Sequence, residues 1–147
     1  MIFASKLVAA FIASVLYGSL FNVPRRAILG GGLAGAAGWA VFDLIMMKGG
    51  GPILGVLAGA ALVSVIAEGL ATWQRLPATT IIVPGIIPLV PGLPAYQTML
   101  VFVRGETLEG ITRGTQTMLT SGAIAAGVAF VSLAIRYLRG SRRAGRQ

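Results

Sequence analysis

Histidine and cysteine are both absent from this 147-residue chain. Without cysteine there is no disulfide, no thiolate nucleophile and no indication of the redox compartment, and without either residue the common zinc sites are excluded. Carboxylates are scarce as well, because Asp43, Glu68, Glu106 and Glu109 are the only acidic residues. Since no nucleophile–base pair or metal-ligand set is present, we expect no catalytic residue, metal or cofactor, and therefore no enzyme.

Charge is rare and apolar residues dominate the composition. Only 11% of the residues are charged and 56% are hydrophobic, with a mean hydropathy of +0.86. Soluble domains carry about 25% charged residues. Five apolar segments each approach the roughly 20 residues that span a bilayer. We therefore predict an all-α integral membrane protein with about five transmembrane helices, at residues 2–21, 27–47, 52–72, 78–103 and 115–138.

These segments form one predicted transmembrane domain over residues 1–138, followed by a basic cytoplasmic tail at 139–147. Lys6 before an apolar run is compatible with a signal peptide, but no small-residue cleavage site follows, which favours a retained helix. The polar stretch RGETLEGITRG, at 104–114, is expected to be a short interfacial helix or a loop.

The net charge of +8 does not indicate nucleic-acid binding, because no folded basic domain or aromatic platform accompanies it. Basic residues that flank apolar segments indicate a lipid bilayer instead, with a possible role in holding anionic headgroups. If all five segments cross, the two sides hold eight and four basic residues: Arg25, Arg26, Arg75 and the five C-terminal arginines, against Lys6, Lys48, Arg104 and Arg113. This count places the C-terminus in the cytoplasm. A re-entrant fourth segment changes the count to seven against five.

Glycines four residues apart predict close helix packing in the second and third segments, because small residues let helix backbones approach in a membrane. They are Gly31 and Gly35, then Gly51, Gly55 and Gly59. The spacing is compatible with contacts inside this chain or between copies of it. The large aromatic residues Trp39, Trp73 and Tyr137 lie toward segment ends and are interpreted as interface anchors.

The fourth segment contains four prolines, Pro84, Pro88, Pro91 and Pro94, in the stretch PATTIIVPGIIPLVPGLPAYQT at 77–98. Each proline removes a backbone donor and clashes with the preceding turn, so no continuous helix survives this spacing. Irregular backbone at membrane depth must be buried in protein or line a wet cavity, as in transporter substrate sites. We therefore predict a break with a functional role. A kinked structural helix whose free carbonyls are satisfied by its neighbours is the alternative.

Pro94 suits the first position of a new helix, where its missing N–H is harmless. The first turn, Ala95 to Gln97, would then offer N–H groups and a positive dipole end to a substrate carboxylate. Tyr96 and Gln97 add side-chain donors and acceptors. A run of polar residues at the start of the fifth segment offers a weaker prediction of a polar path, since such side chains often bond their own helix. These residues are Thr115, Gln116, Thr117, Thr120 and Ser121.

Asp43 and Glu68 are the only carboxylates inside apolar segments, and such residues often mark proton pathways. Each lies near the C-terminal end of its segment, so antiparallel helices would place them toward opposite membrane faces. They are therefore not a catalytic pair. For Glu68, proton coupling and a structural ion pair are equally compatible with the sequence. For Asp43 the structural ion pair is favoured.

The stretches FNVPRRA at 21–27 and PATTIIVPGIIPLVPGLPAYQTM at 77–99 resemble the threonine/serine exporter family, in particular the small subunit of its two-component form. The resemblance implies a bacterial inner-membrane exporter of threonine, serine or a dicarboxylate such as succinate, coupled to the proton-motive force. It also implies a larger membrane subunit as partner. The motif residues to which it gives most weight are Pro84, Gly85, Pro88, Pro91, Gly92 and Tyr96.

The leading hypothesis is therefore a secondary transporter subunit with the broken segment at its substrate site and Glu68 or Asp43 as proton carrier. A homo-oligomeric, channel-like pore is the first alternative. The second is a structural subunit whose partner holds the whole site. ATP is excluded as a direct energy source, because the chain has no nucleotide-binding motif.

Overall fold

The protein is all-α throughout residues 2–144, which are the part of the chain that this computed structural model describes. The predicted fold class is confirmed. The helices in chain order are α1 (Ile2–Leu20), α2 (Arg25–Met47), α3 (Pro52–Gln74), α4 (Thr79–Ile86), the 3-10 turn η1 (Ile87–Leu89), α5 (Gly92–Val103) and α6 (Thr107–Ala144).

Four of these helices, α1, α2, α3 and α6, are long and apolar enough to cross a membrane. Together α4, η1 and α5 make a fifth span if they count as one segment, with a bend of 52° at the break between Leu89 and Gly92. The sequence therefore predicted both the number of apolar segments and the interruption of the fourth. We conclude that the chain is a multi-pass membrane protein.

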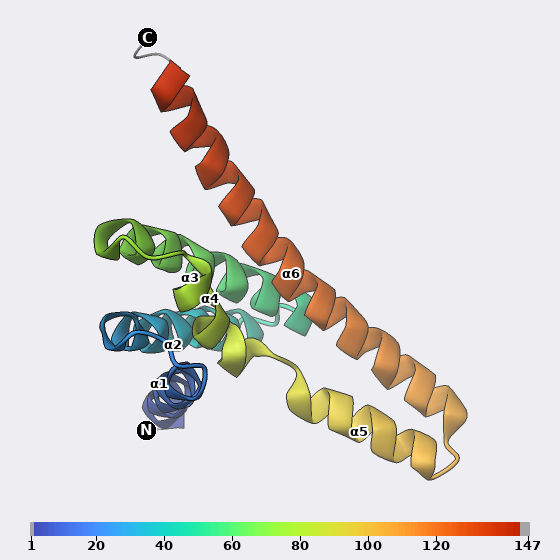
Figure 1. The fold of residues 1–147 in the computed structure, drawn as a ribbon. Helices are drawn as coiled ribbons and strands as arrows, with labels where there is room; N and C mark the ends of the chain where they lie inside the picture. Colours follow the sequence, from blue (N-terminus) through green and yellow to red (C-terminus); the bar gives the residue numbers. More distant parts are fainter. Residues whose placement is uncertain (1, 145–147) are drawn as a thin grey trace.

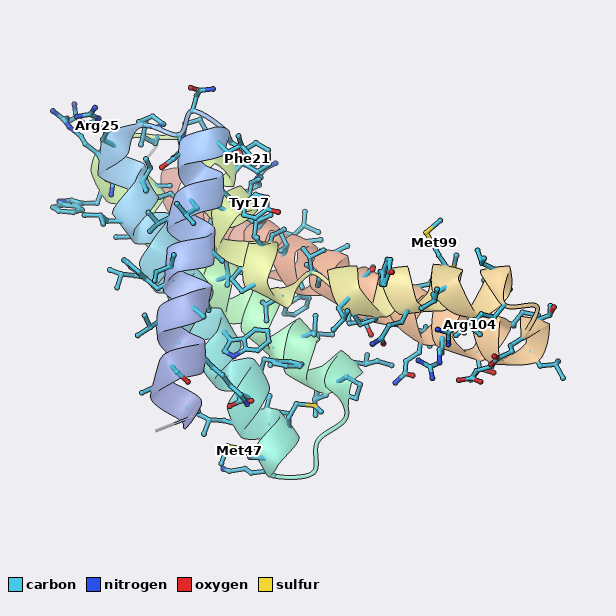
Figure 2. All side chains as sticks on the ribbon, turned by 90° about the horizontal axis from the view of Figure 1, so that it is seen from below. Tyr17, Phe21, Arg25, Met47, Met99 and Arg104 are labelled. Carbon is cyan, nitrogen blue, oxygen red and sulfur yellow. The ribbon has the colours of Figure 1, made fainter. Side chains whose placement is uncertain are left out.

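The helix α2 lies at the centre of a bundle, where it packs against α1, α3 and α4 (Figure 1). Arg25 and Met47 mark the two ends of α2, and the C-terminal end of α1, with Tyr17 and Phe21, lies at the Arg25 end (Figure 2). The helix α5 packs against α6 instead, and the two form a hairpin that projects from the bundle. The helix α6 rejoins the bundle by packing on α3.

Glycines make the close contacts of the bundle, as their spacing predicted, and these contacts lie within the chain. A methyl group at Gly59 would lie 2.7 Å from the carbonyl oxygen of Gly38 on α2, so the backbones of α2 and α3 touch at this point. A methyl group at Gly31 would lie 3.0 Å from Cγ of Pro84, which brings α4 against α2. The exception is Gly51, which precedes α3 and has nothing within 4 Å.

The fifth apolar segment begins earlier than predicted, because α6 already starts at Thr107 and takes in most of the stretch expected to be an interfacial helix or loop. Glu109 in the first turn complements the helix dipole, and it pairs with Arg113 one turn later. Gly110 and Gly114 also lie in this first part of α6, where their lack of a side chain makes room for α5. Each faces α5, and a methyl group there would lie 2.8 Å from Phe102 and 3.3 Å from Thr98, respectively.

Candidate functional site

The break in the fourth segment is built by three prolines in succession. Pro84 lies inside the short helix α4, and Pro88 lies in the 3-10 turn that follows it. Val90 then adopts an extended conformation with ψ of 127°, as expected for a residue before a proline. The chain leaves this kink at Pro91 and enters α5. The extended backbone at Val90 therefore follows from the proline that comes after it.

The new helix starts two residues before the position that the sequence predicted. Gly92, not Pro94, is the first residue of α5, and Pro91 is its N-cap. The N–H of Ala95 donates to the carbonyl oxygen of Pro91 at 3.0 Å, and that of Gly92 donates to Val90 at 2.8 Å. The turn expected to offer free donors is thus largely bonded to its own backbone. The N–H of Ala95 is therefore not free as expected, whereas a substrate-binding role for the turn from Ala95 to Gln97 stays a prediction.

Two of the motif residues serve packing. Pro84 and Gly85 are buried on α4 between α2 and α3. A methyl group at Gly85 would lie 2.8 Å from a side-chain carbon of Val63 on α3, so no larger residue fits there without a shift. The contact of Pro84 with Gly31 closes the other side. These residues hold the first half of the broken segment against the bundle.

A cavity of about 740 Å³ lies where the break, the bundle and α6 meet. Four predicted site residues line it, namely Pro88, Pro91, Pro94 and Gln97, whereas Tyr96, Gly92, Pro84 and Gly85 do not. Tyr96 is 63% exposed on α5. The further lining residues are Trp39, Phe42, Pro52, Val56, Leu89, Val90, Leu93, Arg113, Gln116, Thr117 and Thr120.

The walls of this cavity differ in polarity. The residues from α2, α3 and the break are apolar apart from the indole N–H of Trp39, whereas α6 contributes Arg113, Gln116, Thr117 and Thr120. Thr117 and Thr120 donate to their own helix, to the carbonyl oxygens of Arg113 and Gln116. Each hydroxyl oxygen still has acceptor capacity toward the cavity. Of the five residues that the sequence suggested for a polar path, three line the cavity: Gln116, Thr117 and Thr120.

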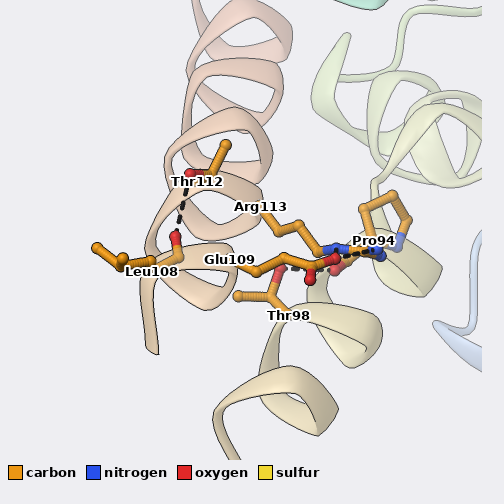
Figure 3. Close-up of polar contacts among 6 residues, drawn as sticks. All are labelled: Pro94, Thr98, Leu108, Glu109, Thr112 and Arg113. Carbon is orange, nitrogen blue, oxygen red and sulfur yellow. Dashed lines mark hydrogen bonds and ion pairs between the residues drawn. The ribbon is translucent and has the colours of Figure 1, made fainter. Parts of the chain in front are cut away.

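Arg113 is the cation of this polar wall, and the sequence reasoning did not include it in the site. Its Nε and Nη2 both donate to Oε1 of Glu109, at 2.9 and 2.6 Å. Figure 3 shows the Arg113 side chain reaching from α6 toward Pro94 at the start of α5, next to Glu109. The spacing of four residues between Glu109 and Arg113 was the available signal. It was overlooked because the stretch was expected to lie outside the fifth membrane helix.

Trp39 is partly buried and lies eight residues before the end of α2, whereas the sequence predicted an interface anchor toward a segment end. It packs against the core around Val63 and Leu89, with its ring 5.1 Å from that of Phe42. Its indole N–H is buried and has no hydrogen-bond acceptor within the described residues. Trp39 also lines the cavity. Trp73 and Tyr137 are 82% and 80% exposed near helix ends, as expected of interface anchors.

The two membrane carboxylates have different surroundings. Lys6 on α1 donates to Oδ1 of Asp43 at 2.9 Å, which joins the two helices by an ion pair. Glu68 is buried on α3 at 7% exposure, and its backbone oxygen accepts from the Thr72 hydroxyl. Consecutive antiparallel helices carry the two carboxylates near opposite ends. Among residues 2–144 no three acidic side chains come together as a metal site would require.

A family model described as "Threonine/Serine exporter, ThrE" matches residues 6–134, which is most of the chain. The chain belongs to the threonine/serine exporter family. A curated relative named threonine/serine exporter, from Corynebacterium glutamicum, is 29% identical over 107 residues, covering 73% of this chain and 21% of the relative. The chain thus spans about a fifth of that relative's length. No solved structure matches the chain significantly.

The family match includes the whole cavity of this threonine/serine exporter family member, since every lining residue falls between Trp39 and Thr120. It also includes Glu109, Asp43 and Glu68. The break, the polar wall and the buried carboxylates are therefore all parts of the family domain. Residues after 134, with the C-terminal arginines, lie outside the match.

Proposed function

We propose that this chain is the small subunit of a secondary active exporter in the bacterial inner membrane. Its cargo is a small hydrophilic metabolite, either threonine or serine or a dicarboxylate such as succinate. Family membership supports amino-acid export as the activity. The cavity beside the proline break is the substrate site, and alternating access moves the site between the two sides of the membrane.

The observation that carries this proposal is the pairing of a proline break with a polar wall around one cavity. Its volume of about 740 Å³ falls within the roughly 300–1,000 Å³ of small-molecule sites. An apolar lining with a few placed polar groups is the usual construction of such sites. Pro88 and Pro91 on one side and Thr117 on the other line the same space. A kinked structural helix alone would not require this polar wall.

Glu68 is the proposed proton carrier of this exporter. It is a carboxylate buried in an apolar helix, and ionisable residues in such places often mark proton pathways. Asp43 is the less suitable of the two candidates, because Lys6 holds it as an ion pair. Proton coupling would make export depend on the transmembrane pH gradient.

A larger membrane subunit is the proposed partner, since this chain spans about a fifth of the curated relative. Transporter sites often lie where two repeats or halves meet. The hairpin of α5 and α6 projects from the bundle, and α1 packs only on the first half of the broken segment, α4 and η1, so α6 is the main neighbour of α5 and the other side of α5 is exposed. A second subunit on that side would complete the enclosure of the cavity.

The test is efflux of labelled threonine, serine and succinate from proteoliposomes, with and without an imposed pH gradient. The chain is reconstituted alone and together with the larger exporter subunit of its own organism. Saturable, gradient-dependent flux only with both subunits supports the proposal. Flux from this chain alone, insensitive to the gradient, indicates a homo-oligomeric pore instead. Unchanged flux in a variant with the cavity filled, for example Thr117→Trp, assigns the site to the partner and makes this chain a structural subunit.

A further inference from the structure

We propose that Arg113, oriented by Glu109, binds the carboxylate of the transported substrate, and that this pair selects a zwitterionic amino acid over a dicarboxylate. The inference rests on the proposed function, because it assigns a substrate class to the same cavity. It adds a residue that was not among the predicted site residues. The inference is based on the hydrogen-bond geometry of the Arg113 guanidinium.

A guanidinium has two edges that can bind a carboxylate, the side-on edge of Nε and Nη2 and the end-on edge of Nη1 and Nη2. Glu109 occupies the side-on edge, because Nε and Nη2 both donate to its single oxygen Oε1. Two of the five N–H donors are used in this way. The end-on edge has no recorded partner within residues 2–144, and Arg113 lines the cavity.

Glu109 acts on Arg113 as a positioning residue. Pairs one helical turn apart with both side chains nearly half exposed, as here, contribute little to stability. The contact therefore does little to hold the fold together. It does fix the direction of a long, flexible side chain, which otherwise has many rotamers. In Figure 3 the Arg113 side chain extends toward Pro94, which lines the same cavity.

The charges around this edge favour one class of carboxylate. Gln97, Gln116 and Thr117 lie on the same lining and supply hydrogen bonds for a substrate hydroxyl. The carboxylate of Glu109 beside the guanidinium attracts an ammonium group and repels a second carboxylate. The carboxylate and ammonium groups of a hydroxy amino acid can pair with Arg113 and Glu109, respectively, whereas succinate offers a partner to Arg113 only. The pair thus favours threonine or serine as substrate.

Trp39 provides a direct reporter of binding, because it lines the cavity. The chain has two tryptophans, and Trp73 is highly exposed, so Trp73→Phe leaves the cavity residue Trp39 as the single tryptophan, which can be excited selectively. The purified chain in lipid nanodiscs is titrated with L-threonine, L-threonine amide and succinate. The amide keeps the ammonium and hydroxyl groups and lacks the carboxylate. Arg113→Gln, Arg113→Lys and Glu109→Gln are compared with Arg104→Gln, which removes a charge from the same hairpin outside the cavity.

The unsubstituted cavity should bind threonine about tenfold or more tightly than the amide, the preference expected of a charge-assisted bidentate contact. Arg113→Gln should abolish this preference, and Arg113→Lys should keep part of it, because lysine retains charge without the edge. Glu109→Gln should weaken threonine binding and raise the affinity for succinate relative to threonine. Arg104→Gln should change neither the preference for threonine over the amide nor the affinity for succinate relative to threonine.

A preference for threonine over the amide that survives Arg113→Gln overturns the inference, as does an equal loss in Arg104→Gln. A fluorescence signal that responds to none of the three compounds also overturns it. Failure of the transport proposal has a different signature. In that case proteoliposomes show no flux, while the carboxylate preference in nanodiscs and its loss in Arg113→Gln remain.

Discussion

Lys6 Nζ lies 2.9 Å from Oδ1 of Asp43, and this contact ties α1 to α2 across 37 residues of sequence. Asp43 is the more buried partner, with 11% of its side chain exposed against 44% for Lys6. An ionised carboxylate in such a place depends on its cation. The ion pair explains how a charged residue is accommodated in an apolar helix.

Removing only Lys6 should therefore destabilise the protein more than removing both charges. We expect Lys6→Met to lower the free energy of unfolding by about 1–3 kcal/mol, because the carboxylate of Asp43 is left without its partner. The double variant Lys6→Met/Asp43→Asn should recover at least half of this loss. Thermal unfolding in detergent measures both. A loss of stability in the double variant that equals the sum of the losses in Lys6→Met and Asp43→Asn contradicts an ion-pair role.

Glu68 should behave differently, because we propose it as the proton carrier. Glu68→Gln should reduce gradient-driven efflux by about tenfold or more, while exchange of labelled for unlabelled substrate persists, since a neutral amide cannot carry a proton. Asp43→Asn serves as the matched control and should retain the response to the pH gradient. Proteoliposome flux with and without a gradient measures this. Gradient-driven efflux that survives in Glu68→Gln excludes Glu68 as carrier.

Much of the fold was predictable because it depends on composition and on special backbone residues. Apolar length located α1, α2 and α3 to within two residues at each end, although not the start of α6, and the prolines located the break at Pro84 to Pro91. The glycine spacing predicted close contacts, which Gly31 and Gly59 make. Each of these features acts through local sterics and needs no knowledge of neighbouring helices.

The site was less predictable, because it depends on which face each helix turns inward. A membrane helix that is apolar all round carries little amphipathic signal, so nothing in the sequence placed Trp39 on the cavity side of α2. The pairing of Lys6 with Asp43 depends on how α1 packs on α2, which no sequence pattern specified. Arg113 was missed because the start of α6 was placed after it.

The close approach of α2 and α3 gives a stability prediction with an internal control. Gly59→Ala places a methyl group 2.7 Å from the carbonyl oxygen of Gly38, so the helices must move apart. We expect a loss of about 1–3 kcal/mol in the free energy of unfolding, as for other overpacked sites. Gly69→Ala on the same helix meets nothing within 4 Å and should be neutral or stabilising. Thermal unfolding of the two variants checks the contrast. Equal effects of the two substitutions contradict the predicted contact.

Straightening the break should weaken binding without unfolding the protein. In the double variant Pro88→Ala/Pro91→Ala, two backbone donors return and the clash with the preceding turn disappears, so η1 and α5 can join as one helix. Pro88 and Pro91 also line the cavity, and a continuous helix would change its shape. We expect helix content by circular dichroism to rise slightly, and binding of threonine, read from Trp39 fluorescence in the Trp73→Phe background, to weaken about tenfold or more, because a site must hold its groups to within a fraction of an ångström.

Pro94→Ala is the control, because Pro94 lines the same cavity but lies in the first turn of α5, where a missing N–H has no cost. It should leave helix content unchanged and binding within about threefold of the unsubstituted chain, a loss of less than 1 kcal/mol. If the double variant gains helix and still binds threonine normally, the break is a structural kink and the cavity does not depend on it. If both variants lose binding equally, the proline side chains contact the ligand and the backbone geometry is not the cause. Loss of binding in Pro88→Ala/Pro91→Ala, with normal binding in Pro94→Ala, assigns the binding function to the broken backbone itself.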